Sequence, residues 1–176
     1  CGFATEVAND IVTSANTLNQ QWDTYSETLK TAGEVDNDFS DVHDAVNAVS
    51  NALFYIDGMV KDNKIGTPLG LFSNDCGGVG SVCIENVESP LSDQSISHLI
   101  QNLKAFQQIF TGEGNDSENT LGFDDYLIDV NDQATSDAII NSTQQAIDDL
   151  EAYQQSLTAQ LATDATIVET THGKVK

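Results

Sequence analysis

Apolar side chains recur three or four positions apart along most of this 176-residue chain, and one long segment interrupts the pattern. Such spacing places side chains on one face of an α-helix. It predicts long helices over residues 3–29, 42–62, 92–112 and 132–162, and a short helix or turn over 122–130. The chain is therefore predicted to be all-α, an up-and-down bundle of about four long helices.

The first predicted helix has a continuous apolar stripe, which we expect to face the core. Trp22 lies on this stripe and is expected to be a core residue. Gly58 lies inside the second predicted helix and suggests a close approach of two backbones. The stripe of the first helix consists of Phe3, Val7, Ile11, Ala15, Leu18, Trp22, Tyr25 and Leu29.

The interruption, residues 63–91, contains both prolines of the chain and a cluster of glycines. Compact domains rarely contain so long a connection unless it has a role. Its two cysteines, Cys76 and Cys83, flank the flexible spacer GGVGSV, and we expect them to form a disulfide that pins this crossover. A zinc pair is the alternative, but the segment has no CxxC spacing and no nearby histidine. A disulfide favours an oxidising compartment.

The charge of the chain is strongly acidic. Six Lys and Arg face 28 Asp and Glu, a formal net charge of −22. Such a charge repels nucleic acid and anionic lipid surfaces, so neither is an expected partner. No apolar run approaches the roughly 20 residues that a transmembrane helix needs.

Cys1 has three alternative roles. It could pair with a cysteine outside this chain, remain a free thiol, or carry a lipid anchor as the first residue of a bacterial lipoprotein. Cys-Gly is a plausible start for such a lipoprotein, and the residues upstream of Cys1 would decide between the three.

The common catalytic motifs are missing from the sequence. None of His43, His98 and His172 has Glu or His at the spacing of a zinc-protease motif, and no GxSxG elbow is present. No catalytic residue and no metal site are therefore predicted. His98 follows the start of a predicted helix, where Glu88 and Asp93 are plausible neighbours.

Four segments in order, KIGTPLG, VESPLSDQS, NLKAFQQIFTG and GFDDYL, resemble the second half of the imelysin family of bacterial envelope proteins. The resemblance extends over nearly the whole chain. It implies an all-helical fold of two bundle halves, export to the periplasm or outer membrane or secretion, and a link to iron or haem acquisition.

The family's GxHxxE motif, on which some members are classed as metallopeptidases, is absent here, so no peptidase residue can be assigned. What the resemblance does assign is a polar segment near the contact of the two halves. Glu88, Ser92 and Ser95 match that segment, and adjacent His98 completes the predicted binding site.

Three functions follow from this resemblance. The first is a non-enzymatic imelysin-like envelope protein linked to iron or haem uptake, although no site in this chain supports either cofactor. The second is part of a metallopeptidase whose catalytic motif lies outside the chain. The third is an extracellular structural or assembly protein.

We expect residues 1–176 to be one imelysin-like bundle within a larger two-half protein, whose remainder, or a partner helical bundle, is the expected partner. The tail contributes to this expectation. Val168 and Val175 stand seven residues apart, as if they began a further helical stripe.

Overall fold

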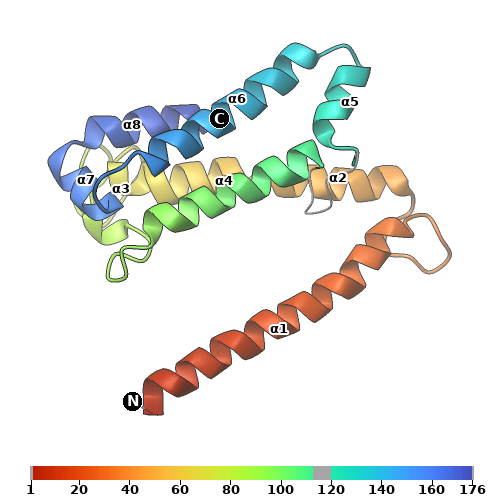
Figure 1. The fold of residues 1–176 in the computed structure, drawn as a ribbon, viewed down its shortest axis with the longest axis horizontal. Coiled ribbons are helices and arrows are strands. Elements are labelled where there is room, and N and C mark those ends of the chain that lie inside the picture. Colours follow the sequence, from red (N-terminus) through yellow and green to blue (C-terminus); the bar gives the residue numbers. More distant parts are fainter. Residues whose placement is uncertain (1, 113–119, 176) are drawn as a thin grey trace. The chain divides into compact units, whose positions relative to one another are not determined.

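The computed structural model describes residues 2–112 and 120–175, and within these ranges the protein is all-α, with no strand. The fold class is therefore confirmed, whereas a simple bundle of four long helices is not observed. The elements are α1 (Gly2–Lys30), α2 (Val42–Leu53), η1 (Ile56–Gly66), α3 (Thr67–Leu69), η2 (Ile84–Asn86), α4 (Ser95–Thr111), α5 (Phe123–Asp129), α6 (Gln133–Glu151), α7 (Leu157–Thr163) and α8 (Ala165–Lys174) (Figure 1).

The chain divides into two compact units, Cys1–Ala52 and Leu53–Lys176. The N-terminal unit contains α1 and nearly all of α2. Helix α1 ends at Lys30, and in the turn that follows Gly33 has a positive φ of 89° and donates its N–H to the carbonyl of Phe39 at 3.1 Å. The Asn37 side chain closes the turn, since its amide donates to the carbonyl of Thr28 at 2.9 Å and its oxygen accepts from the N–H of Phe39 at 2.8 Å.

The expected burial of the α1 stripe is wrong within this unit. Trp22 is 59% exposed and no residue of α1 is buried. The ring of Trp22 packs on that of Tyr25, which contacts Phe39 in turn. A unit of two helices and one turn has too little chain to enclose a stripe of this length.

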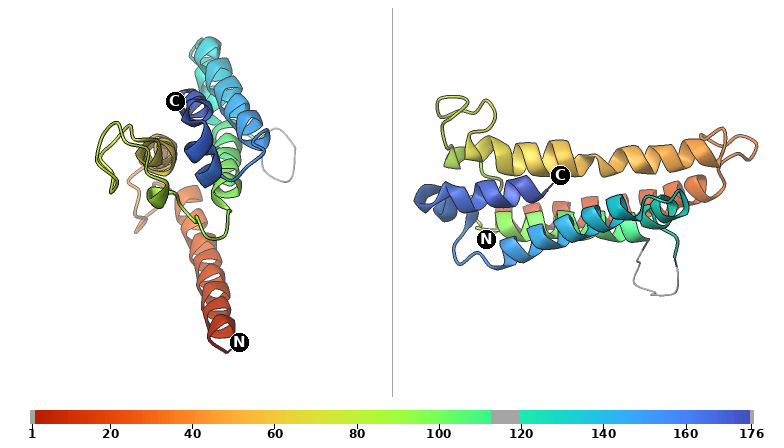
Figure 2. Two further views of the ribbon diagram at one scale, coloured as in Figure 1. Left: turned by 90° about the vertical axis from the view of Figure 1, so that its left-hand side faces the viewer. Right: turned by 90° about the horizontal axis from the view of Figure 1, so that it is seen from above.

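The C-terminal unit contains the hydrophobic core. Helices α4 and α6 lie side by side and run in opposite directions, and α8 lies along both α6 and η1 (Figure 2). The core draws apolar residues from η1, α3, the crossover and every helix from α4 to α8 except α5. The buried residues are Val60, Ile65, Leu69, Val87, Leu99, Leu103, Ala146, Ile147, Leu150, Leu157, Leu161, Val168 and Val175.

The helix predicted over residues 42–62 is two elements. After α2 the chain winds into η1, a π-helix in which each turn is wider by one residue. The N–H of Thr67 continues this winding by donating to the carbonyl of Asp62, five residues back. Gly58 lies in η1, and among the described residues no atom outside its own turns of helix lies within 4 Å of where a Cβ would stand, so the predicted close approach of two backbones is wrong.

The helix predicted over residues 132–162 is also interrupted, because α6 ends at Glu151 and α7 begins at Leu157. Both helices have a side-chain N-cap. Asp132 accepts a hydrogen bond from the N–H of Thr135, and Ser156, in an extended conformation, accepts one from the N–H of Ala159. The break separates α7 from α6, and Leu157 and Leu161 of α7 still lie in the core.

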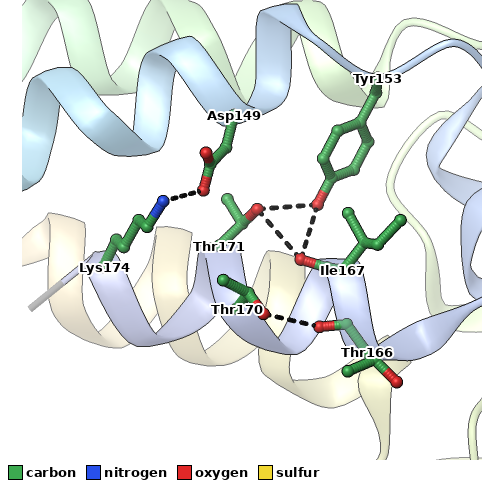
Figure 3. Close-up of polar contacts among 7 residues, drawn as sticks. All are labelled: Asp149, Tyr153, Thr166, Ile167, Thr170, Thr171 and Lys174. Atoms are coloured by element: carbon green, nitrogen blue, oxygen red, sulfur yellow. Dashed lines mark hydrogen bonds and ion pairs between the residues drawn. The ribbon is translucent and has the colours of Figure 1, made fainter.

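The tail forms α8, and its apolar residues are buried. Val168 and Val175 are 1% and 3% exposed. Polar contacts also hold α8 on α6 (Figure 3). The Lys174 ammonium lies 2.6 Å from the Asp149 carboxylate, and the hydroxyls of Tyr153 and Thr171 are 2.9 Å apart. Val168 lies within α8 and Val175 directly follows it, so both apolar positions of the predicted stripe are buried.

Candidate binding site at the start of α4

Within the crossover, residues 74–83 fold back on α3 and on Gly70, which follows α3. The N–H of Gly80 donates to the carbonyl of Gly70 at 2.7 Å, and that of Cys83 donates to the carbonyl of Pro68 at 2.8 Å. The side-chain amide of Asn74 donates to the carbonyl of Ser81 at 2.6 Å. These bonds give a connection without a long helix of its own a defined conformation.

The predicted disulfide between Cys76 and Cys83 is present, with the two Cα atoms 5.3 Å apart. Cys83 is fully buried, and Val87, four residues further on, belongs to the core. The crossover is therefore tied to the core at its second half and is not a peripheral flap.

Helix α4 begins three residues later than predicted, at Ser95 instead of Ser92. The Ser92 hydroxyl does not cap the helix, because it donates to the carbonyl of Ser89 at 3.3 Å. The buried Ser95 hydroxyl donates to the carbonyl of Glu88. This bond fixes the backbone of Glu88 against the first turn of α4.

Four side chains meet beside this turn, and we call them the Glu88 cluster: Lys64, Glu88, His98 and Asn102. The Lys64 ammonium lies 3.2 Å from Oε2 of Glu88 and donates to Oδ1 of Asn102 at 3.0 Å. Nδ1 of His98 lies 3.8 Å from the same Glu88 oxygen. His98 and Asn102 are four residues apart and share one face of α4, while Lys64 comes from η1.

The side chains of the cluster differ in their exposure to solvent. The Lys64 side chain is 16% exposed, whereas those of Glu88 and His98 are 41% and 46% exposed. The Lys64 side chain is therefore mostly covered, whereas the Glu88 carboxylate and the His98 imidazole beside it are partly accessible.

Of the four predicted site residues, the structure brings Glu88 and His98 together, uses Ser95 to position Glu88, and leaves Ser92 in its own turn. Sequence reasoning missed Lys64 and Asn102. Asn102 could have been found, since it follows His98 by one helical turn. Lys64 lies 24 residues before Glu88 in the sequence, and no local spacing indicates their contact.

The sequence model of the imelysin family, peptidase family M75, matches residues 1–174. The chain belongs to the imelysin family. No curated protein and no solved structure matches it. Members of the family are extracellular or envelope proteins, and the disulfide of this imelysin is compatible with such a location. Among the described residues, no helix combines the length and apolar character that crossing a bilayer requires.

The donor groups of the Glu88 cluster can be compared with those that a bare iron ion and haem require. The cluster offers one carboxylate and one imidazole, fewer than the three or four protein ligands usual for a tightly held bare ion. Haem needs only one axial imidazole from the protein, and its propionates pair with cations. The four side chains of the cluster therefore supply fewer ligands than a resident bare iron ion usually has.

A second polar group lies at the end of η1. Nε2 of His172 lies 3.7 Å from Oδ1 of Asp62, and the Lys61 ammonium lies 3.4 Å from the same oxygen. The hydrogen bond of Lys61 to Asp57 raises the pKa of its ammonium, with Asp62 adding to the effect. A Cβ on Gly66 would lie 3.1 Å from Nε2 of His172 and 2.6 Å from the ring of Phe72, so these two side chains pack directly over the glycine. This group secures α8 to η1, and we assign it a structural role.

Proposed function

We propose that this imelysin is a non-enzymatic protein of the cell envelope that takes part in acquiring iron or haem, and that the Glu88 cluster contacts the ligand. The observation that carries the proposal is the accessible His98 imidazole beside the covered Lys64 ammonium. Imidazole is an axial ligand for haem iron, and an ammonium group can pair with a propionate. The disulfide and the family membership support a periplasmic, outer-membrane or secreted location.

A haemin titration followed by the Soret absorbance tests the proposal. We expect His98→Ala to weaken haemin binding about tenfold or more, the loss of roughly 1.4 kcal/mol of binding free energy. His43→Ala is the matched control, because His43 is an exposed histidine on α2, outside the cluster. Equal affinities of the two variants would contradict the assignment of the site.

Glu88→Gln distinguishes haem from ferric iron. If ferric iron were the ligand, the change would remove a carboxylate ligand and would weaken Fe³⁺ binding. It also frees the Lys64 ammonium from its pair with Glu88, so haemin affinity should be kept or increased. Loss of haemin binding in this variant would mean that the carboxylate itself contacts the ligand.

Membership of a peptidase family favours one other candidate, a metallopeptidase whose catalytic motif lies outside this chain. The full-length protein, incubated with a denatured protein substrate with and without added Zn²⁺ and with a chelator, separates the two functions. Cleavage that requires metal would overturn the non-enzymatic proposal. Haemin binding without cleavage supports it.

A further inference from the structure

The ligating atoms of Cys76, Cys83 and Glu85 lie within 4.8 Å of one another. Oε2 of Glu85 is 2.9 Å from Sγ of Cys76 and 3.7 Å from Sγ of Cys83. In the disulfide the two sulfurs are bonded to each other and bind no metal as thiolates. Once reduced, the same three side chains would offer two thiolates and a carboxylate.

The residues next to Cys76 and Glu85 are linked to each other by hydrogen bonds that do not involve sulfur. Asp75 and Asn86, the neighbours of Cys76 and Glu85, are joined by two hydrogen bonds. The Asn86 amide donates to the Asp75 carboxylate at 2.7 Å, and the Asp75 N–H donates to the Asn86 side-chain oxygen at 3.1 Å. Neither bond involves a sulfur atom, so neither is broken by opening the disulfide itself.

Both cysteines also have anchors of their own. The N–H of Cys76 donates to the side-chain oxygen of Asn74 at 3.0 Å, and the buried Cys83 donates its N–H to the carbonyl of Pro68 at 2.8 Å. Asn74 in turn bonds the carbonyl of Ser81, across the glycine-rich spacer. Both cysteines are therefore held by backbone hydrogen bonds that do not involve the sulfur–sulfur bond.

We propose that the reduced crossover is a metal site, in which Cys76, Cys83 and Glu85 bind one thiophilic divalent cation of the Zn²⁺ type and water fills the fourth position. Two thiolates, a carboxylate and one open position form a tetrahedral set that zinc accepts. The disulfide closes the site, so metal binding is controlled by oxidation. The proposal uses none of the residues of the Glu88 cluster.

The chemistry requires a reductant of the dithiol class. A thiolate of the dithiol attacks one sulfur of the disulfide, a mixed disulfide forms, and the second thiol of the dithiol resolves it. Cys76 is exposed and Cys83 is buried, so the sulfur of Cys76 is the accessible one. Two electrons and two protons pass to the cysteines, and the dithiol becomes a disulfide. The cation then displaces both thiol protons.

Titration of the full chain with Co²⁺, a spectroscopic substitute for Zn²⁺, tests the proposal. Protein in a Cys1→Ser background is reduced with dithiothreitol and desalted without oxygen, and an oxidised sample of the same variant serves as the control. We expect the thiolate-to-cobalt charge-transfer band to saturate at one Co²⁺ per chain in the reduced protein alone. Added Zn²⁺ should remove the band.

The role of Glu85 is tested by Glu85→Gln, which should weaken Zn²⁺ binding about tenfold or more, since a direct ligand is lost. Glu169→Gln, at an exposed acid on α8, is the matched control and should leave affinity unchanged. Calorimetry in buffers of different ionisation enthalpy should detect the release of two protons. Absence of the cobalt band in reduced protein, a band of equal strength in oxidised protein, or equal affinity of the two Gln variants would overturn the proposal.

Discussion

Lys64 is the side chain that holds the Glu88 cluster together, because its ammonium contacts both Glu88 and Asn102 from a different helix. We expect Lys64→Met to lower the free energy of unfolding by about 1 kcal/mol, since a partly covered ion pair and a hydrogen bond are lost together. Urea titration of the wild type and the variant, followed by far-ultraviolet circular dichroism, measures this difference.

Lys30→Met is the matched control for that prediction. Lys30 also pairs with an acid, at 2.6 Å from Glu27, but both side chains are about two-thirds exposed, at 67% and 66%. Exposed pairs one helical turn apart contribute about 0.5 kcal/mol or less. If Lys64→Met and Lys30→Met lowered the free energy of unfolding equally, the contacts that Lys64 makes between helices would stabilise the protein no more than an exposed ion pair does.

Tyr153 gives the α6–α8 contact a dependence on alkaline pH. Burial raises the pKa of the Tyr153 phenol above its ordinary value of 10.0, partly offset by the hydrogen bond with Thr171. The unfolded phenol ionises first, so the folded state loses stability as pH rises from 10.0 through the raised pKa. Tyr153→Phe should be about 1 kcal/mol less stable at pH 8, because the hydrogen bond is lost.

The difference in the free energy of unfolding between the wild type and Tyr153→Phe should become smaller as pH rises past the ordinary pKa of tyrosine, because phenylalanine cannot ionise. Unfolding titrations of both proteins at several alkaline pH values measure it, and the ring-carbon shift of labelled Tyr153 gives the pKa directly. A difference that is constant with pH would contradict the assignment.

At the residue scale, the contacts that could be predicted from the sequence join residues close together in the chain. The Cys76–Cys83 bond and the proximity of Glu88 to His98 lie within ten residues of chain and were both found. Lys64 was not, because its contact with Asn102 spans 38 positions. The prediction that Trp22 is buried was wrong for another reason. Periodicity indicates which face of a helix is apolar, but it does not indicate whether the same unit supplies an element to cover that face.

Gly70 shows how the crossover depends on one backbone position. Its φ is 89°, and a Cβ would stand 2.5 Å from the carbonyl oxygen of Ser81. Gly70→Ala should therefore lower the free energy of unfolding by more than about 1 kcal/mol, through left-handed strain and a backbone clash.

Gly58→Ala is the comparison for Gly70→Ala in the same thermal-melting assay. Gly58 lies inside η1 with open space around it, so alanine should be neutral or stabilise by up to about 1 kcal/mol. The opposite signs of the two substitutions are the expected result. If Gly70→Ala had no effect, the packing of the crossover on α3 would have to be looser than the structure shows.

At the element scale, helix existence was predictable and helix boundaries were not. The stripes for α1, α4 and α6 gave the right elements. The change to a π-helix at Ile56 has no periodic signature in a short window, because three- and four-residue spacings tolerate an added residue. The break before Ser156 depends on a serine cap that also occurs inside helices, so composition alone does not reveal it.

At the scale of the whole molecule, the core described here belongs to one unit. All thirteen core residues lie between Val60 and Val175, whereas Ala45 is the one buried hydrophobic residue described in the N-terminal unit. The sequence suggested a single bundle, because the helical stripes of the two units are equally regular. The division into units depends on how many elements enclose each stripe, and that is a property of tertiary packing.

The charge of the whole chain leads to the last prediction. With 28 acidic and six basic side chains, most carboxylates have no cation to pair with, and a net charge of −22 opposes the compact state. Salt shortens the reach of this repulsion, since the Debye length falls from about 30 Å at 0.01 M to about 3 Å at 1 M. The midpoint of thermal unfolding should therefore rise with NaCl, even though the ion pairs of Lys64 and Lys174 weaken.

Equal ionic strengths of NaCl, KCl and MgCl₂ should raise the midpoint by similar amounts, because screening does not depend on the identity of the cation. Scanning calorimetry of the oxidised protein measures this. A midpoint that falls with NaCl would mean that the attractive pairs outweigh the repulsion. A rise produced by micromolar Mg²⁺ alone would instead mean that the carboxylates form a specific cation site, and the acidic surface would then be a binding feature and not a solvated one.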